Sequence, residues 1–367
     1  MMKVLMLSAD KSIFDPESVS HQRMCDYGGL VEELHIVIHT AKSEKRKAKN
    51  IGENIFVYPT NDWVRILYFV NSHKIAKKIL VASGQWLITT QDPFETGLVG
   101  YLVKRKFKLP LQIQIHTDFL SPYFWKESLK NKFRVILAKY LVKKTNGLRV
   151  VSERIRNSLV ASGCASKPID VLPIFVDVEK IKSSPVKADL HKKYPNHDFI
   201  ILMASRLTKE KNIGLAIRAM AEIIKKYSRT LLLIVGNGPE LKNLKSQISN
   251  LKLQNDVVLE NWSNDLPSYY KTADLFLLTS NYEGYGLTAV EATAAGLLVL
   301  MTDVGIAMGK TVPVGDGPSL VNTLDRFISS QIERERILNN QKAALKFYDS
   351  RSDYMKFIKQ SWQNCFL

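Results

Sequence analysis

Two glutamates lie eight positions apart in the stretch SNYEGYGLTAVEATAAG, residues 280–296. Glu283 falls in a glycine-rich turn, and Glu291 lies about one turn into a helix expected over 287–295. Glycines let a ligand approach the backbone, and free N–H groups at the start of a helix attract an anion such as phosphate. A carboxylate can accept two hydrogen bonds from a vicinal diol. The spacing favours a diphosphate flanked by two polyols, which is a nucleotide sugar. The alternative is a surface turn with both glutamates solvated.

Two cations stand at the end of another expected strand, in the stretch SRLTKEKNIGLAIRA. Arg206 follows that strand directly, and Lys211 comes five residues later, before a helical pattern. Fixed cations at this edge can neutralise a diphosphate and stabilise the negative charge that grows on it when a sugar departs. Taken alone, either residue is more often an ordinary surface cation.

Three further residues follow expected strands. Gly236 and Gly238 come after TLLLIV, and His116 ends LQIQIH. In open α/β sheets, ligands bind beyond the carboxyl ends of the strands, so these positions belong among the candidates. An imidazole there can orient a donor hydroxyl or a phosphate oxygen, although a single histidine at a strand end is also often structural.

Short β-rich runs alternate with helical patterns along the chain. The expected strands are 4–8, 35–40, 86–90, 111–116, 148–152 and 169–173 in the first half, and 199–205, 230–236, 256–260, 274–280 and 297–303 in the second. Strands separated by helices indicate two doubly wound α/β units with parallel sheets. We expect domains over 1–180 and 199–350, joined by the polar, proline-containing linker 181–198.

Several of these motifs, in this order, resemble the retaining glycosyltransferases of family 4. EGYGLTAVEATAAG is similar to the family's E-x7-E motif, ASRLTKEKN to its R-x4-K element and VGNGPE to its glycine turn. VLPIFVD (171–177) and VSERIRNSLVASG (151–163) are also family-like. The resemblance covers most of the chain and implies the GT-B fold, in which two Rossmann-like domains face a central cleft. It implies that 1–180 binds the acceptor, that 199–350 binds the nucleotide sugar, and that a final helix over 351–367 crosses back to the first domain.

The resemblance also implies roles for single residues. Glu283 would contact the donor sugar and Glu291 the ribose, and His116 would lie near the reacting carbon. The implied donor-binding set is Arg206, Lys211, Gly236, Gly238, Glu283, Gly284, Tyr285, Gly286, Leu287 and Glu291, and the implied catalytic set is His116, Glu283, Arg206 and Lys211.

The chemistry implied by the family is transfer with retention, usually through a front-face mechanism in which the departing diphosphate accepts the acceptor's proton. No protein nucleophile is then required. The sequence contains no D-x-D motif, so we expect no metal and no cofactor beyond a UDP- or GDP-sugar co-substrate.

Two departures from the family pattern support a second hypothesis. The stretch VGIAMGKTVPVGD (304–316) looks shortened, and the loop after the first strand lacks the family's glycine pair. The chain would then be a catalytically weak GT-B protein that binds nucleotide sugars or supports a partner enzyme. A third hypothesis, nucleic-acid binding, comes from the net charge of +17. No RNA-binding motif or helix-turn-helix signature accompanies that charge, so we expect no nucleic-acid partner.

The positive charge is concentrated in one block. Residues 101–157 contain 14 Lys and Arg against 3 Asp and Glu, which favours an anionic partner over a merely solvated basic face. Within this block, 126–144 reads as a basic amphipathic helix. Its apolar stripe is Leu129, Phe133, Ile136, Leu137 and Tyr140. We expect most of the stripe to pack on the first domain's sheet and the charges to face anionic lipid reversibly, with 64–82 as a second contact.

These features together predict the location of the protein. The three cysteines are far apart and read as free thiols, and no apolar run approaches the length of about 18 residues that a membrane span requires. The start of the chain reads as a buried strand and not as a signal peptide. We therefore expect a cytoplasmic protein, peripheral to the inner face of the membrane, that glycosylates a lipid-linked, phosphorylated or glycan acceptor in envelope assembly.

Overall fold

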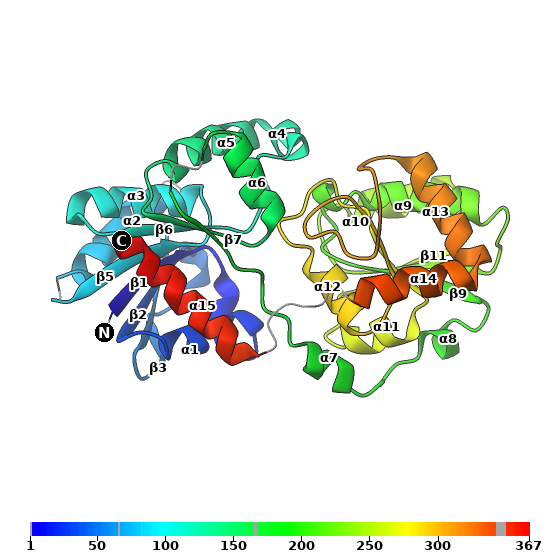
Figure 1. The fold of residues 1–367 in the computed structure, drawn as a ribbon, viewed down its shortest axis with the longest axis horizontal. Helices are drawn as coiled ribbons and strands as arrows, with labels where there is room; N and C mark the ends of the chain where they lie inside the picture. The colour runs from blue at the N-terminus through cyan, green and yellow to red at the C-terminus, as the bar shows by residue number, and fades with distance from the viewer. Residues whose placement is uncertain (1, 65–66, 82, 165–166, 343–349) are drawn as a thin grey trace. The chain divides into compact units, whose positions relative to one another are not determined.

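The computed structural model describes residues 2–64, 67–81, 83–164, 167–342 and 350–367. The chain divides into two compact units (Figure 1). Unit 1 comprises Met1–Pro173 together with Ser350–Leu367, and unit 2 comprises Ile174–Asp349.

Unit 1 is built on an eight-stranded sheet. Its strands, in sheet order, are β3 (Lys49–Gly52), β4 (Ile55–Pro59), β2 (Glu33–Ile38), β1 (Met2–Ser8), β5 (Gln85–Thr90), β6 (Leu111–Ile115), β7 (Gly147–Val150) and β8 (Ile169–Val171). All neighbours pair in parallel except β3, which runs antiparallel to β4. The central strands are buried on both faces, which is why they read as continuous apolar runs and not as alternating patterns.

Helices connect these strands. They are α1 (Val19–Gly28), α2 (Leu67–Ile79), α3 (Glu95–Phe107), α4 (Pro122–Glu127), α5 (Leu129–Val142) and α6 (Glu153–Ala161), with short 3-10 turns at Lys11–Phe14 and Lys42–Glu44. The last helix, α15 (Arg351–Gln363), belongs to unit 1, which it crosses in Figure 1. Its Arg351 pairs with Asp26 of α1, and the following Asn364 donates to Asp170 of β8 at 3.1 Å.

Unit 2 is built on a six-stranded, wholly parallel sheet. Its strands, in sheet order, are β11 (Val257–Glu260), β10 (Thr230–Val235), β9 (Phe199–Ala204), β12 (Leu275–Leu278), β13 (Val299–Thr302) and β14 (Lys310–Val312). Its helices are α7 (Val178–Ser183), α8 (Leu190–Lys193), α9 (Ile213–Ile223), α10 (Leu241–Asn250), α11 (Leu266–Thr272), α12 (Leu287–Ala294), α13 (Gly317–Ser329) and α14 (Gln331–Lys342). Helix α9 buries Ile213, Ile217 and Met220 against the sheet, the i, i+4, i+7 spacing of a half-buried helix.

The fold class predicted from the sequence is confirmed, and each predicted strand overlaps an observed one. The prediction missed β3, β4 and β14. β3 and β14 are four and three residues long and include a lysine, whereas β4 (IFVYP) is apolar and ends in a proline, a residue uncommon inside strands. The predicted linker, 181–198, contains the end of α7 and the whole of α8, and it lies within unit 2. The chain passes between the units at Pro173/Ile174 instead.

The helix predicted over 126–144 is interrupted. Ser128 is extended, and its side chain accepts a hydrogen bond from the Asn131 N–H as the N-cap of α5. The expectation that most of the apolar stripe packs inward is wrong. Leu129, Phe133, Ile136 and Tyr140 are exposed, with 73% of Phe133 accessible, and the buried face of α5 is formed instead by Asn131, Val135, Ala138, Leu141 and Val142.

Candidate active site

The turn that carries the first glutamate ends in a glycine with a left-handed backbone. Gly286 has φ of 92° and is the N-cap residue of α12. A residue with a side chain is strained in this conformation, so the glycine fixes where the helix begins. The carbonyl of Gly286 accepts the Ala289 N–H at 3.0 Å, the first hydrogen bond of the helix. Helix α12 thus begins at Leu287, four residues after Glu283, where the sequence predicts the helix to start.

Glu283 contacts Lys211. The Lys211 Nζ lies 2.5 Å from Glu283 Oε1, and Ser280 Oγ donates to the same oxygen at 2.7 Å. Both charged side chains are largely buried, with 15% of Lys211 and 13% of Glu283 exposed. Two predicted site residues from distant parts of the sequence therefore meet at the start of α12. Ser280 was not among the predicted site residues, although it lies in the same stretch.

Hydrogen bonds fix the loop that presents Lys211. The Thr279 hydroxyl contacts the carbonyl oxygens of Lys211 and Asn212, each at 3.1 Å. The Asn212 side chain, from a residue with φ of 46°, donates to the Asn281 side chain at 3.1 Å, and the Asn281 N–H donates to the Glu210 carbonyl at 2.7 Å. These contacts hold the loops after β9 and β12 together, so the backbone that carries Lys211 has a defined position.

Arg206 is placed differently from Lys211. Its side chain is 76% exposed, and its Nη2 lies 3.2 Å from Glu210 Oε1. The two predicted cations thus share the segment after β9, but Lys211 is held at Glu283 and Arg206 extends toward solvent.

Gly236 and Gly238 are glycines because another loop lies against them. A Cβ on Gly236 would lie 1.9 Å from the Ser205 carbonyl oxygen, and one on Gly238 would lie 2.3 Å from the Leu207 carbonyl oxygen. The Leu207 N–H also donates to the Asn237 carbonyl at 2.9 Å. The glycine turn therefore positions the segment that carries Arg206. Its direct contact with a donor stays a prediction.

Glu291 has a partner that the sequence did not indicate. The Tyr270 hydroxyl of α11 donates to Glu291 Oε2 at 3.1 Å. Burial raises the pKa of the Glu291 carboxyl, and this hydrogen bond opposes the shift. Tyr270 is one of two adjacent tyrosines in LPSYYKT, and no spacing marks it as the one that faces Glu291.

The stretch after β13, residues 304–316, packs on the same turn. The Ile306 N–H donates to the Tyr285 carbonyl at 3.1 Å, and a Cβ on Gly305 would lie 2.4 Å from that oxygen. The Tyr285 side chain is buried, with 3% exposed. A ligand at this turn would therefore meet the backbone of the turn, together with the partly exposed Leu287, and not the ring of Tyr285.

His116 is in unit 1, whereas the other predicted site residues are in unit 2. It follows β6, and its Nε2 lies 3.1 Å from Gln114 Oε1. Burial, together with the charges of Arg149 and Arg23, lowers the pKa of His116 to about 3. The imidazole is therefore neutral at physiological pH.

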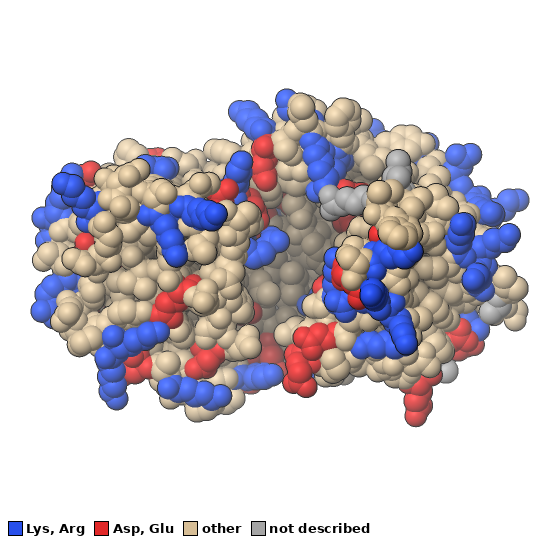
Figure 2. All heavy atoms as spheres, turned by 180° about the vertical axis from the view of Figure 1, so that it is seen from behind, with Lys and Arg blue, Asp and Glu red and all other residues tan. Residues whose placement is uncertain are grey.

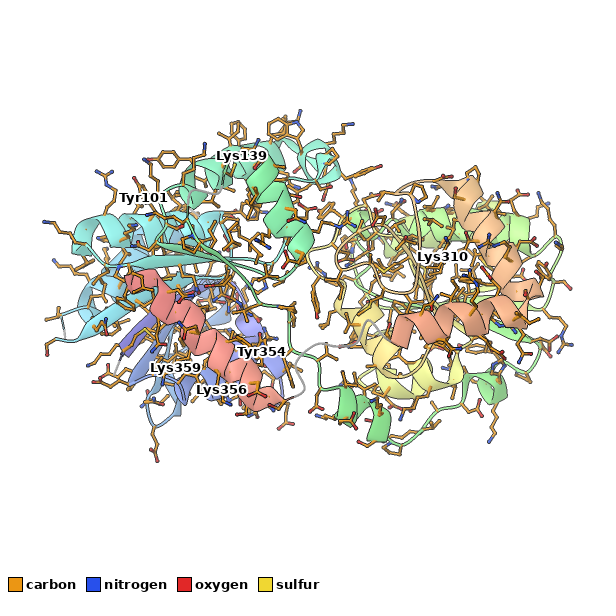
Figure 3. The ribbon with its side chains drawn as sticks, viewed as in Figure 1. Tyr101, Lys139, Lys310, Tyr354, Lys356 and Lys359 are labelled. Carbon is orange, nitrogen blue, oxygen red and sulfur yellow. The ribbon has the colours of Figure 1, made fainter. Side chains whose placement is uncertain are left out.

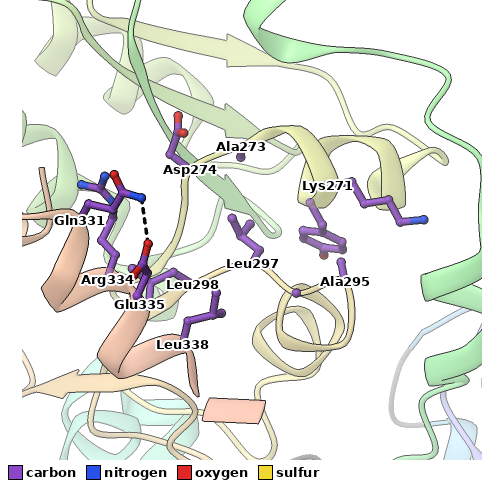
Figure 4. Close-up of a pocket in the computed structure, with 12 residues that line it drawn as sticks. Lys271, Ala273, Asp274, Ala295, Leu297, Leu298, Gln331, Arg334, Glu335 and Leu338 are labelled. Carbon is purple, nitrogen blue, oxygen red and sulfur yellow. Dashed lines mark hydrogen bonds between the residues drawn. The ribbon is translucent and has the colours of Figure 1, made fainter. Parts of the chain in front are cut away.

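A separate cavity of about 320 Å³ lies at the opposite ends of the strands in unit 2 (Figure 4). Its walls include Asp274, just before β12, and Leu298, just before β13, so it faces the amino ends of these strands. A hydrogen bond of 2.8 Å joins Gln331 and Glu335 at its rim. The predicted site residues do not line this cavity.

Comparisons with known proteins cover both units. Residues 187–344 match the family described as "Glycosyl transferases group 1", and residues 32–180 match "Glycosyltransferase Family 4". An alpha-monoglucosyldiacylglycerol synthase of Streptococcus pneumoniae is 29% identical over 296 residues, which is 72% of this chain and 66% of that protein. A UDP-Gal:alpha-D-GlcNAc-diphosphoundecaprenol alpha-1,3-galactosyltransferase of Escherichia coli is 29% identical over 266 residues, 67% of this chain and 66% of that protein. The chain spans about two thirds or less of the length of these curated relatives.

Solved structures share the fold over the whole chain. A sucrose-phosphate synthase of Thermosynechococcus elongatus superposes with a TM-score of 0.82 at 18% identity, covering 100% of this chain and 99% of that one. The Anabaena protein HepE, solved in complex with UDP and glucose, gives 0.77 at 19% identity, covering 99% and 100%. Two parallel-sheet Rossmann-like units in this order are the GT-B architecture.

Proposed function

Because this chain belongs to the group 1/family 4 glycosyltransferases of the GT-B fold, we propose that it transfers a sugar from a nucleotide-sugar donor to a lipid-linked or envelope glycan acceptor. One observation carries the proposal. The Lys211 ammonium and the Glu283 carboxylate are held together at the start of α12, where a helix terminus and a fixed cation offer an anion two kinds of electrostatic support.

The donor is a UDP- or GDP-sugar. Its diphosphate lies between the first N–H groups of α12 and the side chains of Lys211 and Arg206. Glu291 accepts the ribose hydroxyls, and Glu283 accepts hydroxyls of the sugar. The bound UDP in the HepE structure and the UDP-Gal in the name of the E. coli relative support a nucleotide diphosphate as the carrier.

In this arrangement Lys211 interacts with two anions, the Glu283 carboxylate and the diphosphate of the donor. The Lys211 ammonium bonds to Glu283, and a bound diphosphate would compete for the same cation. An ammonium has three donors and can bridge a carboxylate and a phosphate oxygen at once. The ion pair therefore pre-positions the cation beside the phosphate and fixes Glu283 for the sugar, which removes a cost of ordering when the donor binds.

The transfer proceeds with retention through a front-face mechanism, without a metal and without a cofactor other than the nucleotide sugar. Negative charge grows on the diphosphate as the bond to the sugar breaks, and Lys211 and Arg206 stabilise it. The departing phosphate oxygen takes the proton of the acceptor hydroxyl, so no protein side chain forms a bond to the sugar. Activity should persist in EDTA, and the anomeric configuration of the first-formed product, read by NMR, tests retention.

Unit 1 offers a surface for a membrane-bound acceptor. The exposed stripe of α5, defined as Leu129, Phe133, Ile136 and Tyr140, lies among exposed lysines that include Lys126, Lys130, Lys139 and Lys143. Figure 3 labels Lys139 on this helix, and Figure 2 shows Lys and Arg side chains spread over the visible surface. Within the described ranges, every helix is too short or too polar to span a bilayer. We infer reversible contact with the anionic inner face of the cytoplasmic membrane, through apolar insertion and lysine–headgroup attraction.

A second feature of unit 1 suits a phosphate-bearing acceptor. A cavity of about 540 Å³ opens beyond the carboxyl ends of β2 and β4. Lys42, Lys45, Arg46 and the exposed Trp63 line it, and the Lys42 ammonium lies 3.5 Å from the centre of the Trp63 ring. Cations can bind the phosphate of a lipid headgroup, and an indole can stack on a sugar or rest in the membrane interface. Residues 65–66 and 82 of the predicted second contact, 64–82, lie outside the described residues, and Tyr68 within this segment is buried.

The proposal is tested by mixing the purified chain with radiolabelled UDP-glucose, UDP-galactose or GDP-mannose and anionic vesicles that contain diacylglycerol or diphosphoundecaprenol-linked sugar acceptors. We expect lipid-bound label with one donor, and we expect the Lys211→Ala variant to lose it. A chain that binds UDP or GDP but neither transfers nor hydrolyses any donor is the catalytically weak binder of the second hypothesis. A chain that binds no nucleotide overturns both.

A further inference from the structure

Buried polar side chains cover part of one face of the unit 1 sheet. Gln112 and Gln114 alternate along β6 and therefore point to the same side, and His116 follows two residues later. In the parallel register, Thr89 of β5 is opposite Gln112, and Arg149 of β7 is opposite Gln114. Four residues of this face, Thr89, Gln112, Gln114 and Arg149, are at most 3% exposed, so their hydrogen bonds have to be satisfied within the protein.

The orientation of the Gln114 amide follows from its neighbours. Arg149 Nη1 lies 3.1 Å from Gln114 Oε1, and a guanidinium can only donate, so the amide oxygen has to face Arg149. The amide nitrogen then donates to Thr89 Oγ1 at 3.0 Å. The Thr89 hydroxyl in turn points to Gln112 Oε1 at 3.3 Å, and Gln112 Nε2 donates to the Ser361 carbonyl of α15 at 3.0 Å. The hydrogen bonds therefore form one series from Arg149 to Ser361, and each donor in it faces an acceptor.

The orientation of the Gln114 amide determines which ring nitrogen of His116 carries the proton. Gln114 Oε1 has no hydrogen to give, and it lies 3.1 Å from His116 Nε2. The ring nitrogen must therefore be the donor. We propose that Gln114, oriented by Arg149, is a positioning residue that holds His116 as the neutral Nε2–H tautomer and leaves Nδ1 as a hydrogen-bond acceptor.

The neutral state has its own physical cause. An imidazolium could also donate to Gln114, but it would lie buried close to the guanidinium of Arg149, with the charge of Arg23 on α1 nearby. Burial and these two cations lower the pKa of His116 to about 3. One nitrogen of the ring thus carries a proton and the other carries a lone pair.

Arg149 is anchored by two other elements. Its Nη2 donates to the Tyr354 hydroxyl of α15 at 2.8 Å, and Nη1 contacts the Tyr27 hydroxyl of α1 at 3.4 Å. Figure 3 labels Tyr354 on the last helix. The Arg149 Nε has no hydrogen-bond partner within the part of the chain that the structure describes. A buried guanidinium bonded to neutral groups costs stability, which is consistent with a cation kept at this position to orient Gln114.

The tautomer narrows the role of His116, and this step rests on the proposed function. A lone pair on Nδ1 accepts a hydrogen bond from a hydroxyl, but it repels an ionised phosphate oxygen, which has no proton to donate. The sequence leaves two roles open for His116, to orient a donor hydroxyl or a phosphate oxygen. The tautomer favours the first: His116 accepts a hydrogen bond from a hydroxyl of the donor sugar and does not bind the diphosphate.

Long-range ¹H–¹⁵N correlation spectra of the full chain with ¹⁵N-labelled histidine test the proposal directly. We expect a His116 signal set, identified by its loss in His116→Gln, with Nε2 protonated, Nδ1 unprotonated and no change between about pH 5 and 8. A protonated Nδ1 in the neutral ring, or a ring that titrates in that window, would overturn the proposal.

Gln114→Glu tests the positioning residue without removing the acceptor. A carboxylate between the guanidinium and the imidazole favours the imidazolium, so we expect His116 to become doubly protonated at neutral pH and kcat to fall roughly tenfold, with a smaller change in KM. The control is Tyr354→Phe, which removes a bond to Arg149 but none to Gln114, and it should keep the wild-type tautomer. If His116 kept its wild-type protonation state in folded Gln114→Glu, or changed its tautomer in Tyr354→Phe, Gln114 would not be the residue that determines the protonation of the ring.

These spectra separate this inference from the proposed function. The ring state is observed without donor or acceptor, so the expected tautomer in a chain that transfers no sugar would leave the positioning role intact and remove only the catalytic use of His116. If the chain transfers sugar but His116 has the other tautomer, the proposed function stands and the positioning role of Gln114 is wrong.

Discussion

The two units place their polar groups in different ways. In unit 2, Lys211 and Glu283 sit on loops that follow neighbouring strands, and contacts between these two loops bring them together. In unit 1, His116 is connected to a hydrogen-bond chain inside the sheet that ends on the last helix of the protein. The first arrangement depends on a few local segments, and the second depends on strand register and on residues 249 positions apart. The difference teaches that a site on loops can be altered residue by residue, whereas a site built on a sheet face is coupled to the fold.

Lys211→Ala should have the largest effect, because it removes the fixed cation from the loop site. We expect the rate of donor turnover to fall about 10²–10³-fold, the magnitude seen when one pre-organised stabilising group is lost. Glu283→Gln should lower turnover as well, while it keeps an oxygen for Lys211. Donor hydrolysis measured with UDP- and GDP-sugars checks both.

Lys209→Ala is the matched control, because Lys209 belongs to the same 3-10 turn, Lys209–Lys211, but is exposed. It should keep wild-type turnover. Equal losses in the two variants would mean that the net charge of the loop matters and the contact with Glu283 does not.

The second prediction concerns the packing that positions Arg206. In Gly236→Ala the new Cβ would lie 1.9 Å from the Ser205 carbonyl oxygen, so one of the two loops has to move. We expect a loss of about 2–4 kcal/mol in the free energy of unfolding, typical of overpacking against backbone. Urea unfolding followed by circular dichroism measures it.

Gly296→Ala separates crowding from backbone strain. Gly296 has φ of 86°, and a Cβ there would meet nothing within 4 Å. That variant should lose only about 1–2 kcal/mol, the cost of a left-handed residue with a side chain. If Gly296→Ala were the more destabilised variant, the close approach of the two loops would not be the reason for glycine at 236.

The sequence predicts the loop site better than the sheet site for a physical reason. Glu283, Gly286 and Glu291 are close in the chain, so their spacing on a turn and a helix is visible without a structure. Tyr270 and Arg149 were missed because their roles depend on which helix faces α12 and on the register of β6 against β7. Local spacing carries no information about either.

The orientation of α5 was mispredicted for a related reason. Apolar residues occur on both of its faces, with Val135 and Leu141 on the buried side and Phe133 and Ile136 on the exposed side. Periodicity then shows that a helix exists, but it cannot show which face packs on the sheet. The exposed face could be identified only from the structure.

The third prediction uses that exposed face. Phe133→Ser should weaken binding to anionic vesicles roughly three- to tenfold, because a side chain that can enter the membrane interface is lost and nothing in the core is disturbed. Flotation with anionic and neutral vesicles at low and high salt measures the effect. Donor hydrolysis in solution should not change, since the stripe contains none of the residues proposed to contact the donor.

Val160→Ser is the control for exposed apolar area. Val160 is 58% exposed on α6, outside the α5 stripe. It should bind vesicles like the wild type. A similar loss in both variants would contradict a specific membrane-facing stripe and would leave only general surface hydrophobicity.

The smallest expected effect concerns the pH dependence of nucleotide binding through Glu291. Burial raises its pKa above the ordinary value of 4.5, so the carboxylate that would hold the ribose is protonated at a higher pH than an exposed glutamate. Nucleotide affinity should therefore fall on acidification, beginning above that value. The free energy of unfolding depends on pH in the opposite sense. A carboxyl with a raised pKa stabilises the folded chain fully below its unfolded pKa, and this contribution is lost as pH rises through the folded pKa. Between these two pKa values, acidification should therefore weaken nucleotide binding, but Glu291 should cause no loss of folding stability.

Tyr270→Phe sharpens this prediction, because the Tyr270 hydroxyl donates to Glu291 and opposes the upward shift. Removing the hydroxyl should raise the pKa of Glu291 further, move the acid limb of UDP or GDP binding to higher pH, and weaken binding at neutral pH only a few-fold. Titration calorimetry at a series of pH values measures the limb. Tyr269→Phe is the matched control, since the neighbouring hydroxyl bonds to Glu260 at 2.8 Å and not to Glu291. An acid limb that stays in place in Tyr270→Phe, or that moves equally in Tyr269→Phe, would mean that Glu291 does not hold the nucleotide.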